Sequence, residues 1–467
     1  MPGHGPGDSG TVPWSGRGAR RRNPAHSVPL PQGRLRFAWP GCPAAPLGTR
    51  LAVVRLVEPD WTCPFCSLLC DGFALERGAQ PPVLHGSDCP RARAGLAAHA
   101  RHEAPVASID GIAATADDAI GEAARRLAAW RQPLFGGLGT DMAGARALFR
   151  LAARTGAIYD HGDGEALMHG LRALQDRGQC YTTLGEIRAR ADVIVCAGTQ
   201  AVAHYPEFFR RCGLEDPATP CRRLVFLGAE PPPGLPDAVP MLHIAGSGDL
   251  GADLQQLAAL TAGARCRAPD PQLVQLAATL REARYAVLVW EAAMLPAHGA
   301  LLVELLNRIA AGLNRSTRAA TFALGGSDGA YAAQQVFTWL SGLPLRTRAG
   351  ARGLEHDPVR FASARLLQDE AVDGLLWVWS FAPERLPPTT KLPRVVLGPP
   401  GMGPRLRQAE GAQQCVFLPV ATPGFNAAGH LFRTDGVVVP LVVARDEGLS
   451  GVADIAARLL ERLEPVA

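Results

Sequence analysis

The chain has 467 residues, of which 47% are hydrophobic and 19% are charged, and its formal net charge is +4. This length and apolar content suffice for two or three domain-sized cores, so we expect a large globular protein. A net charge this close to zero gives no reason to expect binding to nucleic acid or to an anionic membrane surface.

The sequence lacks the segments that would direct a protein into a membrane or out of the cell. No run of eighteen uncharged apolar residues occurs, and the Arg-rich start has no apolar stretch of the kind found in a secretory signal, so we expect a cytoplasmic protein. The 11 cysteines are an odd number, which in a reducing compartment favours metal ligands and buried thiols over disulfides.

The first part of the chain contains few periodic segments. Residues 1–50 are rich in Pro, Gly and Arg, and we expect a disordered extension there. Residues 51–112 are predicted to form a small β-rich domain around the cysteine loop "WTCPFCSLLCDGF". A strand leads into this loop, and a short β-meander returns from it to Cys89.

Apolar strands then alternate with amphipathic helices, beginning with a helix capped by a Thr and continuing with one that Gly156 ends. Alternation of this kind predicts parallel sheets covered by helices on both faces. Proline-rich breaks divide the region into two doubly wound α/β domains, at 113–265 and 266–412. Residues 413–467 are predicted to form a C-terminal β segment and a helix.

Common nucleotide-binding motifs are absent. The stretch "GGLGTDMAG" fails the dinucleotide fingerprint, because Met142 stands where the third glycine is required. A P-loop is excluded as well, since Lys391 is the only lysine in the chain and no such motif surrounds it.

The cysteine loop is the strongest chemical pattern in the sequence. Cys63, Cys66 and Cys70 are followed after eighteen residues by Cys89, and four thiolates at this spacing can hold one [4Fe–4S] cluster. A structural zinc and a set of unliganded thiols are the alternatives, although zinc usually takes two Cys-x-x-Cys pairs and only one is present. Among the remaining cysteines, four stand singly and are expected to be buried thiols, namely Cys180, Cys196, Cys212 and Cys221.

The cysteine loop, "ALQDRGQCYTTLGEIRARADVIVCAGT" and "FLPVATPGFNAAGHLFRTDGVVV" follow one another in an order that resembles the B subunit of formylmethanofuran dehydrogenase. The resemblance covers roughly residues 55–445. It implies a molybdopterin-oxidoreductase-like fold, with the cysteine-loop domain followed by the two α/β domains.

In that family a Cys-His pair upstream of "ALQD" ligates the Mo or W of a bis-pterin cofactor and assists catalysis. An ungapped comparison places Ala166 and Leu167 at these two positions. A methyl and an isobutyl group can neither ligate a metal nor transfer a proton, so no Mo/W bis-pterin and no catalytic residue is expected. His161 and His169 are nearby but are expected to be surface or turn residues.

The loss of this pair fits a bacterial branch of the family, the formyltransferase/hydrolase complex of tetrahydromethanopterin- and methanofuran-linked one-carbon metabolism. The resemblance then implies a mainly structural B subunit, whose partners are the formyltransferase, amidohydrolase-like and C subunits of that complex. Whether the chain is itself an enzyme stays open. The alternatives are an active formylmethanofuran dehydrogenase redox subunit and a stand-alone α/β binding protein.

Overall fold

The computed structural model of the protein describes residues 57–76, 81–99, 105–216, 219, 222–409 and 412–463. The predicted extension at 1–50 lies outside the described residues. Among the described helices, none combines the length and the apolar character that a bilayer crossing requires.

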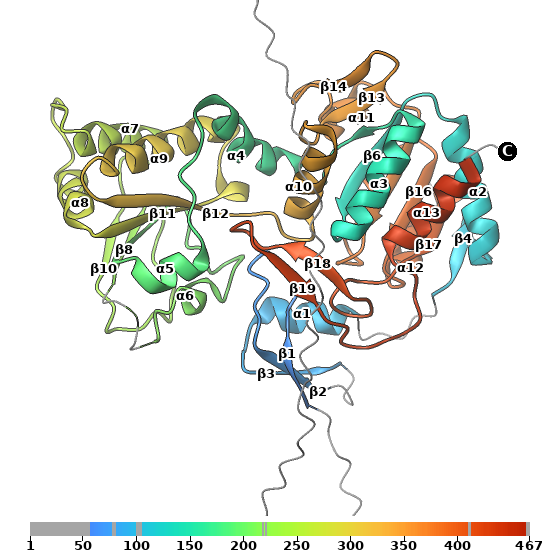
Figure 1. Ribbon diagram of the computed structural model, residues 1–467, viewed down its shortest axis with the longest axis horizontal. Helices are drawn as coiled ribbons and strands as arrows, with labels where there is room; N and C mark the ends of the chain where they lie inside the picture. The colour runs from blue at the N-terminus through green and yellow to red at the C-terminus, as the bar shows by residue number, and fades with distance from the viewer. Residues whose placement is uncertain are drawn as a thin grey trace, which may run out of the picture. The chain divides into compact units, whose positions relative to one another are not determined.

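The cysteine-loop region folds as a small antiparallel sheet in the order β1–β2–β3, followed by helix α1 (Figure 1). This agrees with the predicted meander, whereas α1 was not predicted. The elements are β1 (Val57–Trp61), β2 (Phe73–Glu76), β3 (Val83–His85) and α1 (Pro90–His99).

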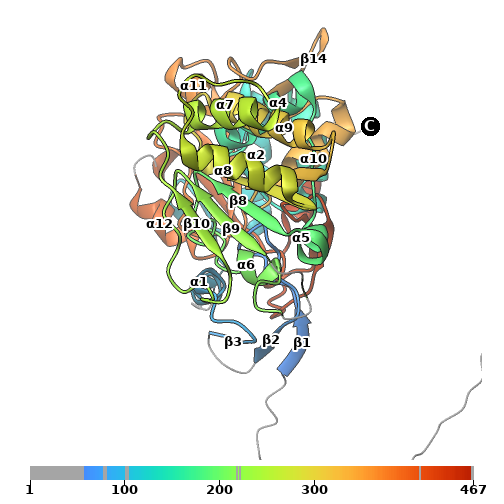
Figure 2. The ribbon, with the colours of Figure 1, turned by 90° about the vertical axis from the view of Figure 1, so that its left-hand side faces the viewer.

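The second sheet has five parallel strands in the order β10–β9–β8–β11–β12. Helices α7, α8 and α9 pack on one face, where Figure 2 shows them above the strands. Helices α5 and α6 cover the other face together with apolar side chains of the cysteine-loop region. The strands are β8 (Val193–Ala197), β9 (Arg223–Leu227), β10 (Met241–Ile244), β11 (Tyr285–Glu291) and β12 (Arg318–Leu324).

The third sheet has nine strands in the order β14–β13–β7–β6–β15–β16–β17–β4–β5. Its five central strands are parallel, and an antiparallel hairpin closes each edge. The strands are β4 (Ala107–Ile109), β5 (Ile112–Ala114), β6 (Pro133–Gly139), β7 (Ile158–Tyr159), β13 (Thr347–Gly350), β14 (Gly353–His356), β15 (Gly374–Trp379), β16 (Arg394–Gly398) and β17 (Cys415–Pro419).

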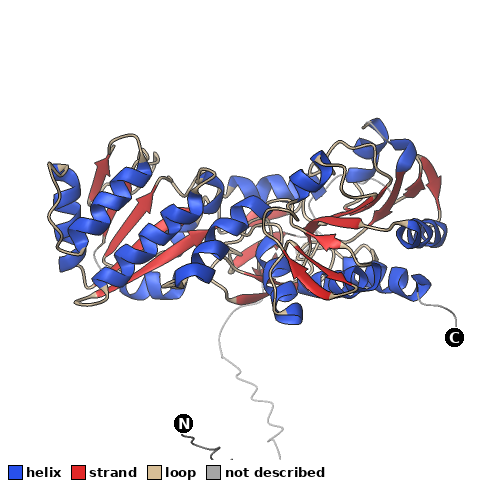
Figure 3. Ribbon diagram, turned by 90° about the horizontal axis from the view of Figure 1, so that it is seen from above, coloured by secondary structure: helices blue, strands red, loops and turns tan. Residues whose placement is uncertain are grey.

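Helices lie on both faces of this sheet as well (Figure 3). Side chains on α2, α3, α10 and α13 form one core with alternate residues of the central strands, and α11 and α12 cover the other face. Thr115 caps α2 and Gly156 ends α3 in a left-handed conformation with φ of 67°, as the sequence predicts.

The helices are α2 (Ala116–Ala129), α3 (Met142–Thr155), α4 (Gly164–Arg177), α5 (Leu184–Arg190), α6 (Phe208–Arg211), α7 (Leu250–Thr261), α8 (Pro271–Glu282), α9 (Gly299–Leu313), α10 (Ala330–Ser341), α11 (Ser363–Gln368), α12 (Met402–Gln408) and α13 (Val452–Leu463). Two short 3₁₀ turns are η1 (Ala292–Met294) and η2 (Ala412–Gln414).

A separate hairpin, β18 (Gly429–Phe432) with β19 (Val438–Leu441), follows the last strand of the large sheet. Asp435 in its turn forms a bidentate ion pair with Arg433, at 2.7 and 2.8 Å, and also accepts a hydrogen bond from the Leu184 amide at 2.9 Å. The hairpin is thereby attached to the start of α5.

The mixed α/β class with parallel sheets is as predicted, but the pairing of strands differs from the predicted boundary near residue 265. Strands β8–β10 precede that point and β11–β12 follow it, yet they share one sheet. The large sheet likewise takes β6–β7 from before residue 160 and β13–β17 from after residue 345. The five-stranded unit is therefore inserted within the nine-stranded one.

Candidate functional site

The four cysteines of the predicted metal site lie together in one apolar cluster. Cys63, Cys66 and Cys70 occupy the loop from β1 to β2, and Cys89 directly precedes α1. The loop is closed by its own backbone, since the Cys63 amide donates to the Cys70 carbonyl at 2.9 Å. Each of the four side chains is buried, with 3–5% of its surface exposed.

Burial determines the protonation of these thiols. It raises the pKa of Cys66 to about 11, although Arg91 opposes the shift. Burial, and the proximity of Cys66, also raise the pKa of Cys70, while Arg211 acts to lower it. Without a cation the thiols of Cys66 and Cys70 are therefore protonated at neutral pH.

The donor set can be compared with what an iron–sulfur cluster requires. A [4Fe–4S] cluster takes four thiolates, its bound iron provides the positive charge that ionises them, and here two arginines lie near enough to the thiols to affect their pKa values. The four donors are therefore of the type that such a cluster takes. In the part of the chain that the structure describes, no group of three or more His, Cys, Asp or Glu side chains is arranged around a point that one metal ion could occupy.

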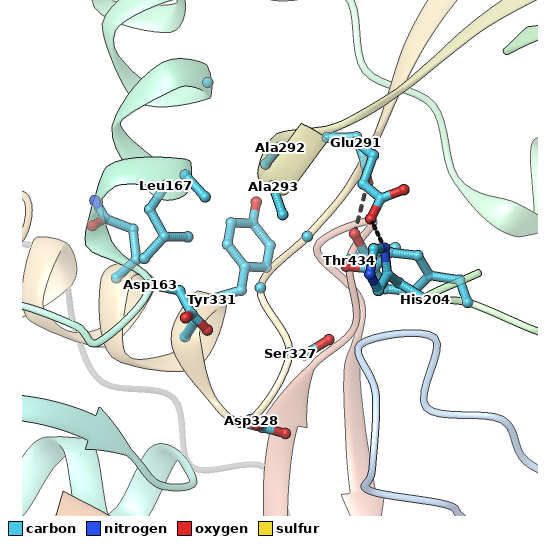
Figure 4. A pocket seen from close by; sticks show the side chains of 18 of the residues that line it. Asp163, Leu167, His204, Glu291, Ala292, Ala293, Ser327, Asp328, Tyr331 and Thr434 are labelled. Atoms are coloured by element: carbon cyan, nitrogen blue, oxygen red, sulfur yellow. Dashed lines mark hydrogen bonds and ion pairs between the residues drawn. The ribbon is translucent and has the colours of Figure 1, made fainter. Parts of the chain in front are cut away.

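A second candidate site lies where strand order reverses. In the five-stranded sheet the order reverses between β8 and β11, and in the nine-stranded sheet it reverses between β6 and β15. The carboxyl ends of parallel strands at such a point form the usual ligand crevice of open α/β sheets. A cavity of about 670 Å³ lies here, lined by residues that follow β7, β8, β12 and β15 and by α1 and α4 (Figure 4).

Helix α4 brings Ala166 and Leu167 to this cavity. Both side chains are half-buried, and Figure 4 shows Leu167 on the cavity wall opposite Ser327 and His204. The two positions that the resemblance assigns to a metal ligand and a catalytic histidine therefore face open space, and they supply only hydrocarbon to it.

Three polar residues at the cavity form a connected group. Glu291, at the end of β11 and 2% exposed, is hydrogen-bonded to Nδ1 of His204, and its second oxygen accepts a hydrogen bond from Thr199 Oγ1 at 2.7 Å. Because both carboxylate oxygens act as acceptors, Nδ1 of His204 is the donor. His204 and Glu291 line the cavity, whereas Thr199 lies behind them.

Asp328 also lines the cavity, in the turn that joins β12 to α10. Its backbone is left-handed, with φ of 53°, and it is followed by Gly329 with φ of 81°. A Cβ at Gly329 would lie 2.0 Å from the carbonyl oxygen of Thr140, so only glycine allows this turn to contact the end of β6. Burial raises the pKa of Asp328 to about 6, against the lowering effect of Arg91.

The two histidines near α4 differ from the prediction that they are surface or turn residues. His161 does lie in a turn, but it is 1% exposed, and His169 is 4% exposed. The Nδ1 of His161 accepts a hydrogen bond from the Asp163 amide at 2.9 Å, and its ring packs on Trp379. The pKa of His161 falls to about 4 and that of His169 is also lowered, in both cases chiefly because of burial.

The predicted buried thiols are found in part. Cys196 and Cys212 are fully buried, whereas Cys180 is only half-buried, because it lies in the open segment between α4 and α5. Cys221 lies outside the described residues.

Sequence reasoning missed His204, Glu291 and Asp328. The available indication was position, since Glu291 ends an apolar strand that the pattern predicts, and His204 and Asp328 lie in the segments that follow two others. Their convergence on one cavity depends on which strands pair, and that cannot be read from local patterns.

Known proteins resemble this chain in both sequence and structure. The B subunit of the formyltransferase/hydrolase complex Fhc of Methylorubrum extorquens is 30% identical over 366 residues, which are 76% of this chain and 96% of that protein. The crystal structure of the FhcABCD complex from this organism, with methylofuran, contains a chain that matches with a TM-score of 0.65 and 28% identity, over 76% of this chain and 98% of that one.

More distant similarity extends to archaeal enzymes. The B subunit of the tungsten-containing formylmethanofuran dehydrogenase 2 of Methanococcus maripaludis is 24% identical over 443 residues, which are 86% of this chain and 98% of that protein. No family model matches the chain. Because the chain is 30% identical to the B subunit of Fhc over 96% of that subunit's length, it belongs to the family formed by the B subunits of Fhc and of formylmethanofuran dehydrogenase.

Proposed function

We propose that this protein is the B subunit of a formyltransferase/hydrolase complex in one-carbon metabolism linked to tetrahydromethanopterin and methanofuran. The observation that carries the proposal is the similarity to the B subunit of Fhc, which spans 96% of that protein. In such a complex the partners are the formyltransferase, amidohydrolase-like and C subunits.

Within the complex we assign the chain a mainly structural role. Ala166 and Leu167 line the cavity where the family's redox chemistry would require a sulfur ligand and a proton-transferring group. A subunit without these groups is retained because its partners are more stable when bound to it.

Assembly is tested by purifying the native protein under mild conditions from its own cells. We expect the formyltransferase and hydrolase subunits to co-purify, and we expect deletion of the chain to lower both formyl transfer and hydrolysis. A free monomer, together with unchanged activities in the deletion strain, would contradict the proposal.

The absence of redox chemistry is tested separately by elemental analysis of the native assembly. We expect no stoichiometric molybdenum or tungsten, since no cysteine stands at position 166. About one Mo or W per chain would instead favour a working formylmethanofuran dehydrogenase subunit.

We further propose that Cys63, Cys66, Cys70 and Cys89 hold a [4Fe–4S] cluster as a structural clamp. The support is a buried four-thiol donor set in a three-stranded sheet that has little core of its own. Iron–thiolate bonds would then hold β1, β2 and α1 together.

The clamp is tested by anaerobic purification and by iron and sulfide assays. We expect about four iron atoms per chain in the wild type and a loss of iron and of stability in Cys66→Ala. Cys415→Ala is the matched control, because Cys415 is equally buried but distant in the fold, in β17. Iron-free protein with unchanged stability in Cys66→Ala would show the loop to be a relic.

A further inference from the structure

The cavity at the strand ends is lined by more negatively charged side chains than positively charged ones. Four carboxylates line it but only two guanidinium groups, those of Arg91 and Arg385. Arg385 is already paired with Asp163 at 2.5 Å, and Arg91 donates to two backbone carbonyls, those of Phe65 and His204. The cavity therefore has an excess of negative charge, which favours positively charged ligands over negatively charged ones.

Of the four lining carboxylates Glu384 is exposed to solvent, and among the other three Asp328 is the one with the least compensation. Within the described ranges its side chain makes no hydrogen bond and no ion pair, unlike those of Asp163 and Glu291. A half-buried carboxylate without a partner is costly to keep ionised. A bound cation would offset that cost directly.

Aromatic side chains make up much of the remaining wall. Six line the cavity, namely Phe65, Tyr181, Tyr205, Trp290, Tyr331 and Phe381. The faces of aromatic rings carry partial negative charge and attract cations, and they also stack on flat apolar groups. Gly95 on α1 and Gly170 on α4 let two of these rings pack close to the helices, since a Cβ would lie 2.3 Å from the Phe65 ring and 3.2 Å from the Trp290 ring.

From these features we infer that the cavity binds a small organic cation with a flat apolar body, whose charge is paired with Asp328. A volume of about 670 Å³ is in the range of small-molecule sites. The pair formed by His204 and Glu291 adds a fixed polar group to the cavity wall, where an imidazole nitrogen can bond a polar substituent. The inference concerns a binding activity and does not depend on the proposed role in a complex.

The test uses three probes of the same shape and different charge on the purified full-length chain. Benzamidine is cationic, benzamide is neutral and benzoate is anionic, and their dissociation constants can be measured by ligand-observed NMR titration. We expect benzamidine to bind at least about tenfold more tightly than benzoate, a difference of about 1.4 kcal/mol, with benzamide between them.

Three variants show where on the chain the probe binds. Asp328→Asn removes the charge and keeps a residue that tolerates positive φ, and it should reduce the preference for benzamidine to less than about threefold. Asp176→Asn, an exposed carboxylate on the same helix as Ala166, removes the same charge outside the cavity and should leave the preference unchanged. Ala166→Phe narrows the cavity and should weaken benzamidine binding at least about tenfold.

Three results would overturn the inference. The first is binding of benzoate as tight as that of benzamidine. The second is a preference that survives Asp328→Asn, which shows the charge to be recognised elsewhere. The third is no measurable binding of any probe up to about 10 mM, well within the reach of ligands of this size. Because Asp328→Asn changes no volume, the test holds even if Ala166→Phe does not fold.

Discussion

At the scale of single residues, the turn from β12 to α10 shows how backbone geometry fixes the cavity wall. Gly329 combines a positive φ with a close approach to Thr140, and its neighbour Asp328 is thereby held at the cavity. Gly342, at the end of the same helix, has a similar φ of 75° but has open space where a Cβ would lie. A side chain at Gly342 would therefore meet only the cost of the positive φ, whereas one at Gly329 would also clash with Thr140.

We expect Gly329→Ala to destabilise the protein by at least about 3 kcal/mol, because the backbone contact must move, and Gly342→Ala by only about 1 kcal/mol. Urea denaturation of both variants beside the wild type measures the difference. Equal effects at the two positions would show that the contact with Thr140 contributes nothing.

His161 makes stability depend on pH. Its folded-state pKa of about 4 lies below the unfolded value of about 6.5, so the contribution of the neutral ring is complete above pH 6.5 and is lost as the pH falls towards 4. His161→Asn keeps an acceptor for the Asp163 amide but does not titrate.

The wild type should therefore lose stability relative to His161→Asn by about 1.4 kcal/mol for each pH unit between 6.5 and 4. Thermal unfolding of both proteins across this range tests the prediction. A difference between the two proteins that stays constant with pH would mean that the ring is not desolvated.

At the scale of elements, the β18–β19 hairpin depends on one buried ion pair. Arg433 and Asp435 are 12% and 0% exposed in their side chains, so the pair is removed from water. Asp435 also accepts from the Leu184 amide, which attaches the hairpin to α5. Removing either charge leaves the other buried without a partner.

Asp435→Asn should cost about 3 kcal/mol of stability, since the guanidinium of Arg433 stays buried. Asp369→Asn breaks the comparable pair with Arg365, whose side chains are about half exposed, and should cost less than about 1 kcal/mol. Chemical denaturation of the two variants compares them. A small effect for Asp435→Asn would mean that water reaches Arg433.

At the scale of the whole molecule, the element types could be predicted and their pairing could not. The apolar pattern of β6, β8, β11 and β15 is local, and so are the caps at Thr115 and Gly156. The pairing of β6 with β15 joins Leu134 to Leu375 across more than half the chain, and local patterns carry no information on it. For the same reason the sequence indicated the cysteine cluster, whose loop is short, but missed His204, Glu291 and Asp328.

This topology predicts which fragments fold. Residues 182–328 contain all five strands of the smaller sheet, so this fragment should unfold cooperatively when studied alone. Residues 113–265 have similar length but contain only parts of two sheets, and they should show no cooperative transition. Circular dichroism with thermal unfolding distinguishes the two. A cooperative 113–265 fragment would support the boundary near residue 265 instead.

The insertion of one sheet within another also has a consequence for synthesis on the ribosome. Strand β6 is complete at Gly139, but its partner β15 begins only at Gly374. At about 5 to 20 residues per second, the apolar strand waits roughly 10 to 50 s for its neighbour, while the inserted unit is completed and folds first. During that interval Leu134 and Phe135 are the residues that a chaperone would have to shield, and the nascent chain folds from the inside of its sequence outwards.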